Sequence, residues 1–134
     1  LKKAESLLPE CEDDYNPMSK LYVAFSVVYN RMKKFKKEKE SYGKIVRAAE
    51  IKKDSNVLVP IFINISTSFL NNESNIKKSK KFVKDALYHS QKIKENIYRP
   101  YIYHLQGRIY LKNKEFKKSL DCLNEAFTSF KKKF

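Results

Sequence analysis

The feature of this sequence that most constrains its fold is a pattern of bulky and small residues that recurs every 40 or 41 residues. Three segments of the chain can be overlaid so that residues of similar kind coincide. The overlaid residues are Tyr22, Ser26, Tyr29, Phe35, Glu38, Tyr42 and Ile45; then Phe62, Ser66, Phe69, Ile76, Ser79, Val83 and Ala86; then Tyr103, Gly107, Tyr110, Phe116, Ser119, Leu123 and Ala126. A recurrence at this length is typical of stacked helical hairpins.

The spacing within each segment predicts two helices joined by a turn. Successive pattern residues are three or four positions apart, which places them on one face of a helix. One longer step of six or seven residues interrupts each segment, at "MKKF", "NNESNI" and "KNKEF". These three stretches are therefore the predicted hairpin turns, and the aromatic residues of the pattern are the predicted core.

Prolines stand before the apolar runs that open the segments. Pro17, Pro60 and Pro100 each precede a run with aromatic residues, and proline fits the first turn of a helix. The run "NVLVPIFINIS" could by itself form a buried strand. Its internal proline disfavours a central strand, and the match to the other two segments favours a helix.

The pattern resembles the tetratricopeptide repeat, most closely in the third segment from Tyr103 to Ala126. Glu38 departs from the family, which has a small residue there, and the spacing exceeds the family's usual length of about 34 residues. The resemblance implies an all-α, right-handed α-α superhelix of about three helical hairpins. We expect one domain over 1–134 with copies at 17–56, 57–98 and 99–134. Ala4 and Pro9 match the end of a preceding copy, a truncated N-terminal helix at 1–13, so we expect a fragment of a longer chain.

The net charge of +14 is distributed in blocks. Arg31 to Lys53 holds ten basic and three acidic residues, whereas Val57 to Asn72 carries no charge. In tetratricopeptide-like superhelices the first helix of each hairpin lines the concave surface. The resemblance therefore implies a nearly neutral groove and a basic, solvated convex face. Nucleic-acid binding, which needs several phosphates neutralised on one surface, stays an alternative through this convex face or through domains outside the sequence.

The resemblance also implies which side chains face the groove. The predicted peptide- or partner-binding residues are Val27, Asn30, Arg31, Ile63, Asn64, Thr67, Asn71, Tyr101, His104 and Arg108, and Lys20, Val23 and Lys112 are also expected to face the groove. Asn side chains both donate to and accept from a peptide backbone. The guanidinium of Arg108 suits a carboxylate, which it can bind with two hydrogen bonds. An apolar wall with amides suits an extended peptide.

The sequence holds no motif for catalysis, a cofactor or a metal ion. It has no glycine-rich phosphate loop, no nucleophile with an evident base and no metal-ligand spacing. Cys11 and Cys122 lie far apart and form no CxxC, so we expect two ordinary reduced thiols. No run of 18 or more apolar residues is present. We therefore expect a cytoplasmic protein that is not an enzyme, has no cofactor and does not span a membrane.

These observations predict a protein- or peptide-binding module. Longer-helix repeats of this kind resemble the sensory regions of bacterial transcriptional regulators and signalling proteins. Two alternatives remain open: a passive assembly scaffold, with self-association through the exposed ends, and nucleic-acid binding through the lysine-rich second helices.

Overall fold

The computed structural model describes residues 15–72, 74–94 and 97–133, and they form helices without any strand. The predicted all-α class is confirmed. The truncated helix predicted at 1–13 lies outside the described residues. The helices are α2 (Tyr15–Arg31), α3 (Phe35–Lys52), α4 (Ser55–Asn72), α5 (Ile76–Ser90), α6 (Arg99–Lys112) and α7 (Phe116–Lys133).

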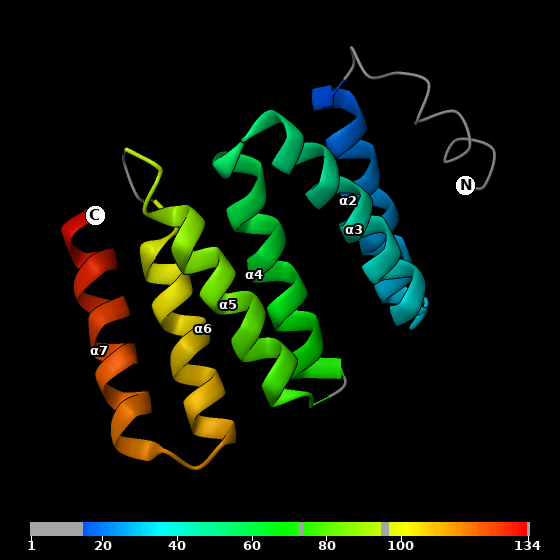
Figure 1. Cartoon of the computed structure of the whole chain (residues 1–134). Coiled ribbons are helices and arrows are strands. Elements are labelled where there is room, and N and C mark those ends of the chain that lie inside the picture. The colour runs from blue at the N-terminus through cyan, green and yellow to red at the C-terminus, as the bar shows by residue number, and fades with distance from the viewer. Residues whose placement is uncertain (1–14, 73, 95–96, 134) are drawn as a thin grey trace. The chain divides into compact units, whose positions relative to one another are not determined.

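The chain divides after Lys53 into two compact units. The first unit contains the hairpin of α2 and α3, and the second contains the hairpins of α4 with α5 and α6 with α7 (Figure 1). Within the second unit α5 packs against α6, and α4 also contacts α6. The predicted stacking of consecutive hairpins is therefore present between the second and third copies. Stacking of the first copy on the second, and the bounds of the copies, stay predictions.

The three hairpin turns share two backbone features, although the closing bond of the second turn spans one residue more. Each contains a residue with a positive φ, two positions before the second helix: Lys33 (59°), Ser74 (49°) and Lys114 (60°). The next residue donates its N–H to a carbonyl of the first helix, from Lys34 to Tyr29 (2.8 Å), from Asn75 to Phe69 (2.9 Å) and from Glu115 to Tyr110 (2.9 Å). Such bonds close the C-terminus of a helix around a left-handed residue. The accepting carbonyls belong to residues that coincide in the sequence overlay, so the repeat extends to the backbone.

Small residues let the two helices of each hairpin in the second unit approach closely. In the second copy, the Ser66 hydroxyl donates to the Ser79 carbonyl (2.7 Å) and the Ser79 hydroxyl donates to the Ser66 carbonyl (2.9 Å). In the third copy, the Ser119 hydroxyl donates to the Gly107 carbonyl (2.7 Å). All three serines are buried. A hydroxyl of the second helix therefore bonds the backbone of the first at the same repeat position in both copies.

The line of contact between the two helices of a hairpin, here called its seam, is different in the first copy because Glu38 stands where the other copies have a small residue. Its side chain is buried, at 1% exposure, and its Oε1 lies 3.9 Å from Lys39 Nζ. The facing Ser26 is fully buried and hydrogen-bonds the hydroxyl of Tyr42. The helices α2 and α3 still form a hairpin, so a polar cluster occupies the place of the serine pair.

Stacked rings connect α4 to α5. The Phe69 and Phe82 rings lie 5.6 Å apart with an interplanar angle of 6°, and Phe62 stacks on His89 at 5.5 Å. Phe62 and Phe69 are buried pattern residues, as predicted.

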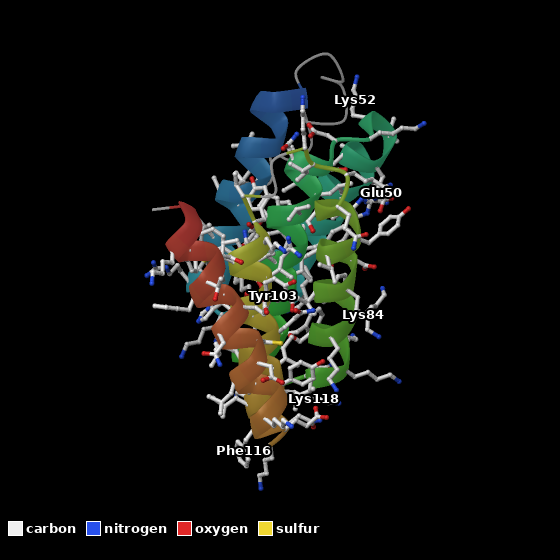
Figure 2. All side chains as sticks on the ribbon, turned by 90° about the vertical axis from the view of Figure 1, so that its left-hand side faces the viewer. Glu50, Lys52, Lys84, Tyr103, Phe116 and Lys118 are labelled. Atoms are coloured by element: carbon white, nitrogen blue, oxygen red, sulfur yellow. The ribbon has the colours of Figure 1, made fainter. Side chains whose placement is uncertain are left out.

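The predicted burial is wrong for Phe116, whose side chain is 60% exposed. It is the first residue of α7, and it lies at the tip of the third hairpin (Figure 2).

The predicted place of Pro60 is also wrong. Pro100 stands at the start of α6, and Pro17 is the third residue of α2, as expected. Helix α4, however, begins at Ser55, so Pro60 lies inside it. The N–H groups of Val57 and Leu58 donate to the Asp54 carbonyl (3.2 and 3.0 Å) and start the helix ahead of the proline. Burial of Leu58 at 2% exposure favours this extra turn.

Two glycines in helices should respond oppositely to substitution. A Cβ at Gly43 in α3 would meet no atom within 4 Å, so Gly43→Ala should raise the free energy of unfolding by about 0.5–1 kcal/mol through helix propensity. A Cβ at Gly107 would lie 2.8 Å from Leu123 Cδ2 and 3.3 Å from the Ser119 carbonyl oxygen. Gly107→Val should therefore cost about 1–3 kcal/mol through overpacking. Urea denaturation followed by circular dichroism measures both, and a neutral Gly107→Val would contradict the close approach.

The buried Tyr42 should make the stability of the first unit sensitive to high pH. Burial raises the pKa of Tyr42 above 10.0 and the Glu38 charge adds to it, while the Ser26 hydrogen bond opposes them. The Tyr42 hydroxyl therefore loses its proton at a lower pH in the unfolded chain than in the folded chain. The stability that the protonated tyrosine contributes is complete below about pH 10 and declines as the pH rises toward the folded-state pKa. Between about pH 9 and about pH 11, Tyr42→Phe should lose less stability than the unmodified chain. Parallel unfolding curves at each pH test this, and equal losses would contradict it.

Candidate peptide-binding surface on the first helices

One face of α4 carries four of the predicted groove residues. Ile63, Asn64, Thr67 and Asn71 follow one another at spacings that keep them on neighbouring positions of the helix surface. Asn64 and Asn71 are exposed, and Ile63 and Thr67 are half-buried. The Thr67 hydroxyl donates to the Ile63 carbonyl at 2.8 Å. This proton is therefore committed within the helix, and toward a ligand the hydroxyl can act as an acceptor.

A hydrogen bond between Arg108 and Asn71 joins α6 to α4. Arg108 Nη2 donates to Asn71 Oδ1 across the two first helices, which lie close to each other in the second unit. Two predicted groove residues from different copies are therefore brought together. The bond uses one of the five N–H groups of the guanidinium and leaves the Asn71 amide nitrogen as a donor.

The other two predicted residues on α6 differ in their surroundings. His104 is exposed. Tyr101 is 48% exposed, and its ring meets the ring of Phe130 in α7 edge to face, with centroids 5.2 Å apart. Tyr101 therefore helps to hold α6 on α7 in addition to presenting its outer edge.

Three predicted groove residues belong to α2 in the first unit. Val27 is 50% exposed, Asn30 is half-buried, and Arg31 is exposed in the last turn of the helix. The side chains of Lys20 and Val23 lie outside the described residues. The structure places these residues only relative to the rest of the first unit. Of the predicted groove, it therefore brings together only the residues on α4 and α6.

The joined face of α4 and α6 is rich in hydrogen-bond donors and poor in charge. Asn64 and Asn71 present amides, and Arg108 supplies a cation with further N–H groups. Helix α4 itself contains no charged residue. Donors at these positions suit the carbonyl oxygens of an extended peptide or a single carboxylate.

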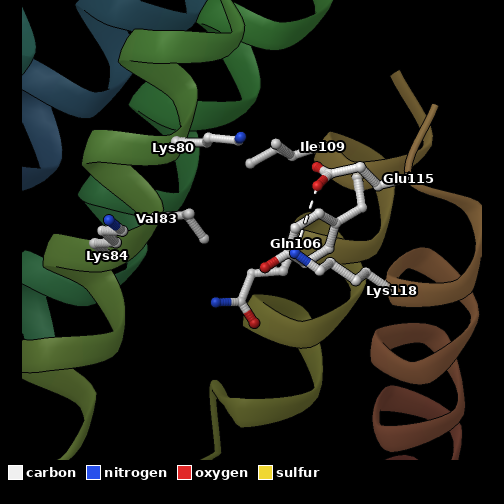
Figure 3. A pocket seen from close by; sticks show the side chains of 8 residues that line it. Lys80, Val83, Lys84, Gln106, Ile109, Glu115 and Lys118 are labelled. Carbon is white, nitrogen blue, oxygen red and sulfur yellow. Dashed lines mark hydrogen bonds and ion pairs between the residues drawn. The ribbon is translucent and has the colours of Figure 1, made fainter. Parts of the chain in front are cut away.

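The structure also shows a pocket that the sequence reasoning missed. It has a volume of about 220 Å³ and lies between the second helix of one copy and both helices of the next (Figure 3). Its lining residues are Lys80, Val83, Lys84, Gln106, Ile109, Tyr110, Glu115 and Lys118. The sequence predicted that most of the positive charge lies on a solvated convex face. Lys80 and Lys84, however, are close in the sequence to the pattern residue Val83, and all three line the pocket beside the next copy.

A carboxylate organises one wall of this pocket. Glu115 Oε2 accepts from Asn113 Nδ2 (2.9 Å), and Glu115 Oε1 lies 3.5 Å from Lys118 Nζ. The hydrogen bond from Asn113 has the largest effect on the pKa of Glu115 and lowers it. Burial opposes this effect, while the interactions with Lys118 and the charge of Lys80 lower the pKa further, so that it lies below its ordinary value. The carboxylate is therefore ionised at neutral pH.

Neither a metal site nor a membrane span is found in the part of the chain that the structure describes. No group of three or more His, Cys, Asp or Glu residues there is placed to hold a metal ion. None of its helices combines the length and apolar character needed to cross a bilayer.

Cys122 is a free, half-buried thiol. Burial raises its pKa, and the nearby charges of Asp121 and Glu125 raise it further. Cys11 lies outside the described residues.

Comparison with known proteins bears on the third hairpin. The sequence model of the tetratricopeptide repeat family matches residues 100–132, which include nearly all of α6 and α7. No curated protein and no solved structure gives a significant match to the chain. The matched segment is the one whose pattern residues resemble this family most closely. The chain therefore contains a tetratricopeptide repeat at residues 100–132, in a helical-repeat fold whose other hairpins share its turn geometry.

Proposed function

We propose that this chain is a protein- or peptide-binding helical-repeat module that forms the sensory or interaction region of a bacterial transcriptional regulator or signalling protein. Tetratricopeptide repeats generally mediate protein interactions, which supports the first part. The observation that carries the proposal is the face shared by α4 and α6, where Asn71 and Arg108 hydrogen-bond across two copies. The long helices of these copies support the second part by their resemblance to bacterial sensory repeats.

The ligand would lie along the two first helices. Asn64 and the Asn71 amide donate to its backbone carbonyl groups, and Ile63 contacts one of its side chains. Arg108 binds a carboxylate or a further carbonyl group while it remains bonded to Asn71. Because the surface spans two copies, a bound peptide favours one arrangement of the hairpins over others and shifts a pre-existing equilibrium.

The binding proposal is tested with linear peptides selected on the purified chain from a random displayed library. Their affinities are measured by fluorescence anisotropy. Asn64→Ala and Arg108→Ala should each weaken binding about five- to tenfold, since each removes one hydrogen bond worth about 1–1.5 kcal/mol. The control is Lys77→Glu/Lys81→Glu, two exposed positions on α5, which should change the affinity by less than about twofold.

Two outcomes would contradict the proposal. Failure to select any peptide would favour a passive scaffold. Binding that survives Asn64→Ala and Arg108→Ala, but falls with salt and with the α5 substitutions, would indicate a charge-driven partner such as nucleic acid. The regulator assignment has its own test in the reading frame that encodes the chain. A helix-turn-helix or kinase segment in the same polypeptide supports it, and a polypeptide of helical repeats alone contradicts it.

A further inference from the structure

The pocket of the second unit has two basic walls on different helices. Lys80 and Lys84 lie one turn apart on α5, and Lys118 lies on α7 (Figures 2 and 3). Figure 3 shows the ammonium group of Lys80 directed across the pocket toward Ile109 and Glu115. The spacing of Lys80 and Lys84 places both side chains on one face of α5. Both line the pocket, and the Lys84 ammonium group lies beside α5 (Figure 3).

The positive charge of this pocket is only partly neutralised. Glu115 pairs with Lys118 at 3.5 Å. Lys80 influences Glu115 only through its charge. Within the described part of the chain, neither the Lys80 nor the Lys84 side chain makes a hydrogen bond or an ion pair. The lining therefore contains three cations and one anion. A single additional carboxylate would offset part of the positive charge that remains near Lys80 and Lys84.

The floor of the pocket is apolar. Val83 and Ile109 are buried, at 3% and 2% exposure, and the half-buried Tyr110 ring lies beneath Lys118 Nζ at 5.8 Å from its centroid. Gln106 adds one amide at the edge. The volume of about 220 Å³ is below the range of about 300–1,000 Å³ that small-molecule sites occupy. The space suits one or two side chains of a peptide better than a cofactor.

We propose that the pocket between α5, α6 and α7 binds an acidic peptide segment of a partner protein. A carboxylate of the segment lies between Lys80 and Lys84, and the apolar side chain next to it packs on Val83, Ile109 and Tyr110. Gln106 hydrogen-bonds the peptide backbone beside that side chain. This site is formed by the second helices α5 and α7 together with α6. Its residues differ from those of the face that α4 and α6 share, so it extends the proposed function to a second ligand.

The lining favours an acidic peptide over a nucleic-acid backbone. The apolar floor has no counterpart on a phosphate backbone, whereas a leucine or aromatic side chain fills it. The charge of +14 on the whole chain increases the rate of encounter with an acidic partner.

The proposal is tested with three synthetic, labelled octapeptides. The first, EELDDLEE, joins carboxylates to two leucines. The second, QQLNNLQQ, keeps the leucines and replaces every carboxylate by an amide, and the third, EEGDDGEE, keeps the carboxylates and removes the apolar side chains. Fluorescence anisotropy on the full chain should show the first peptide binding at least tenfold more tightly than either of the others. Equal binding of the first and third peptides would overturn the role of the apolar floor.

Two matched double variants locate the binding. Lys80→Glu/Lys84→Glu reverses both charges in the pocket and should weaken binding of EELDDLEE at least tenfold. Lys77→Glu/Lys81→Glu makes the same change of charge at exposed positions of the same helix, again one turn apart, and should weaken it less than about threefold. Circular dichroism spectra confirm that both variants are folded. Equal weakening by the two pairs would overturn the proposal, because it would show attraction to the whole basic surface.

A third variant predicts a gain of binding, which a damaged fold cannot mimic. Glu115→Gln removes the carboxylate that competes for Lys118 and should strengthen binding of EELDDLEE about two- to fivefold. Displacement of this peptide by a duplex oligonucleotide that itself requires Lys80 and Lys84 would overturn the proposal in favour of nucleic acid. None of these substitutions touches Asn64 or Arg108, so loss of the pocket site and loss of the first-helix site are separate results.

Discussion

The close approach of the two helices within each hairpin of the second unit is the contact on which the rest of that unit depends. At Ser66 with Ser79, and at Gly107 with Ser119, a buried hydroxyl bonds the backbone of the opposite helix. Bulky residues at these positions would separate the helices and leave buried polar groups without partners, at a cost of about 1–3 kcal/mol each. The seam holds the two helices of a hairpin together. The outer faces of that hairpin can therefore stack on a neighbour and present side chains in a fixed arrangement.

Stacking of these hairpins generates two surfaces of different chemistry. The first helices α4 and α6 meet through Asn71 and Arg108 and present amides with little charge. The second helix α5 packs against α6 of the next copy and leaves a basic pocket with an apolar floor. The division follows from the sequence, in which uncharged and lysine-rich blocks alternate with the helices. The two proposed sites therefore differ in the chemistry of the peptides that they would bind.

The sequence predicted the helices, the turns and most of the core, because a repeated pattern gives three observations of each position. The left-handed turn residues at Lys33, Ser74 and Lys114 lie within the stretches predicted as turns. The start of α4 was missed, since a proline at an internal helix position cannot be distinguished locally from one in the first turn. The pocket was missed because it arises where two copies meet, and its lysines resemble solvent-exposed ones. The first-helix site residues stay a prediction, with Asn71 and Arg108 found in contact.

The most direct test of the seam is a double-mutant cycle at Ser66 and Ser79. The free energy of unfolding is measured in urea for the unmodified chain, for Ser66→Ala, for Ser79→Ala and for the double variant. The reciprocal hydrogen bonds predict a coupling energy of about 1 kcal/mol or more between the two positions. Additive effects, with a coupling energy indistinguishable from zero, would show that the two helices do not meet at these serines and would contradict the account.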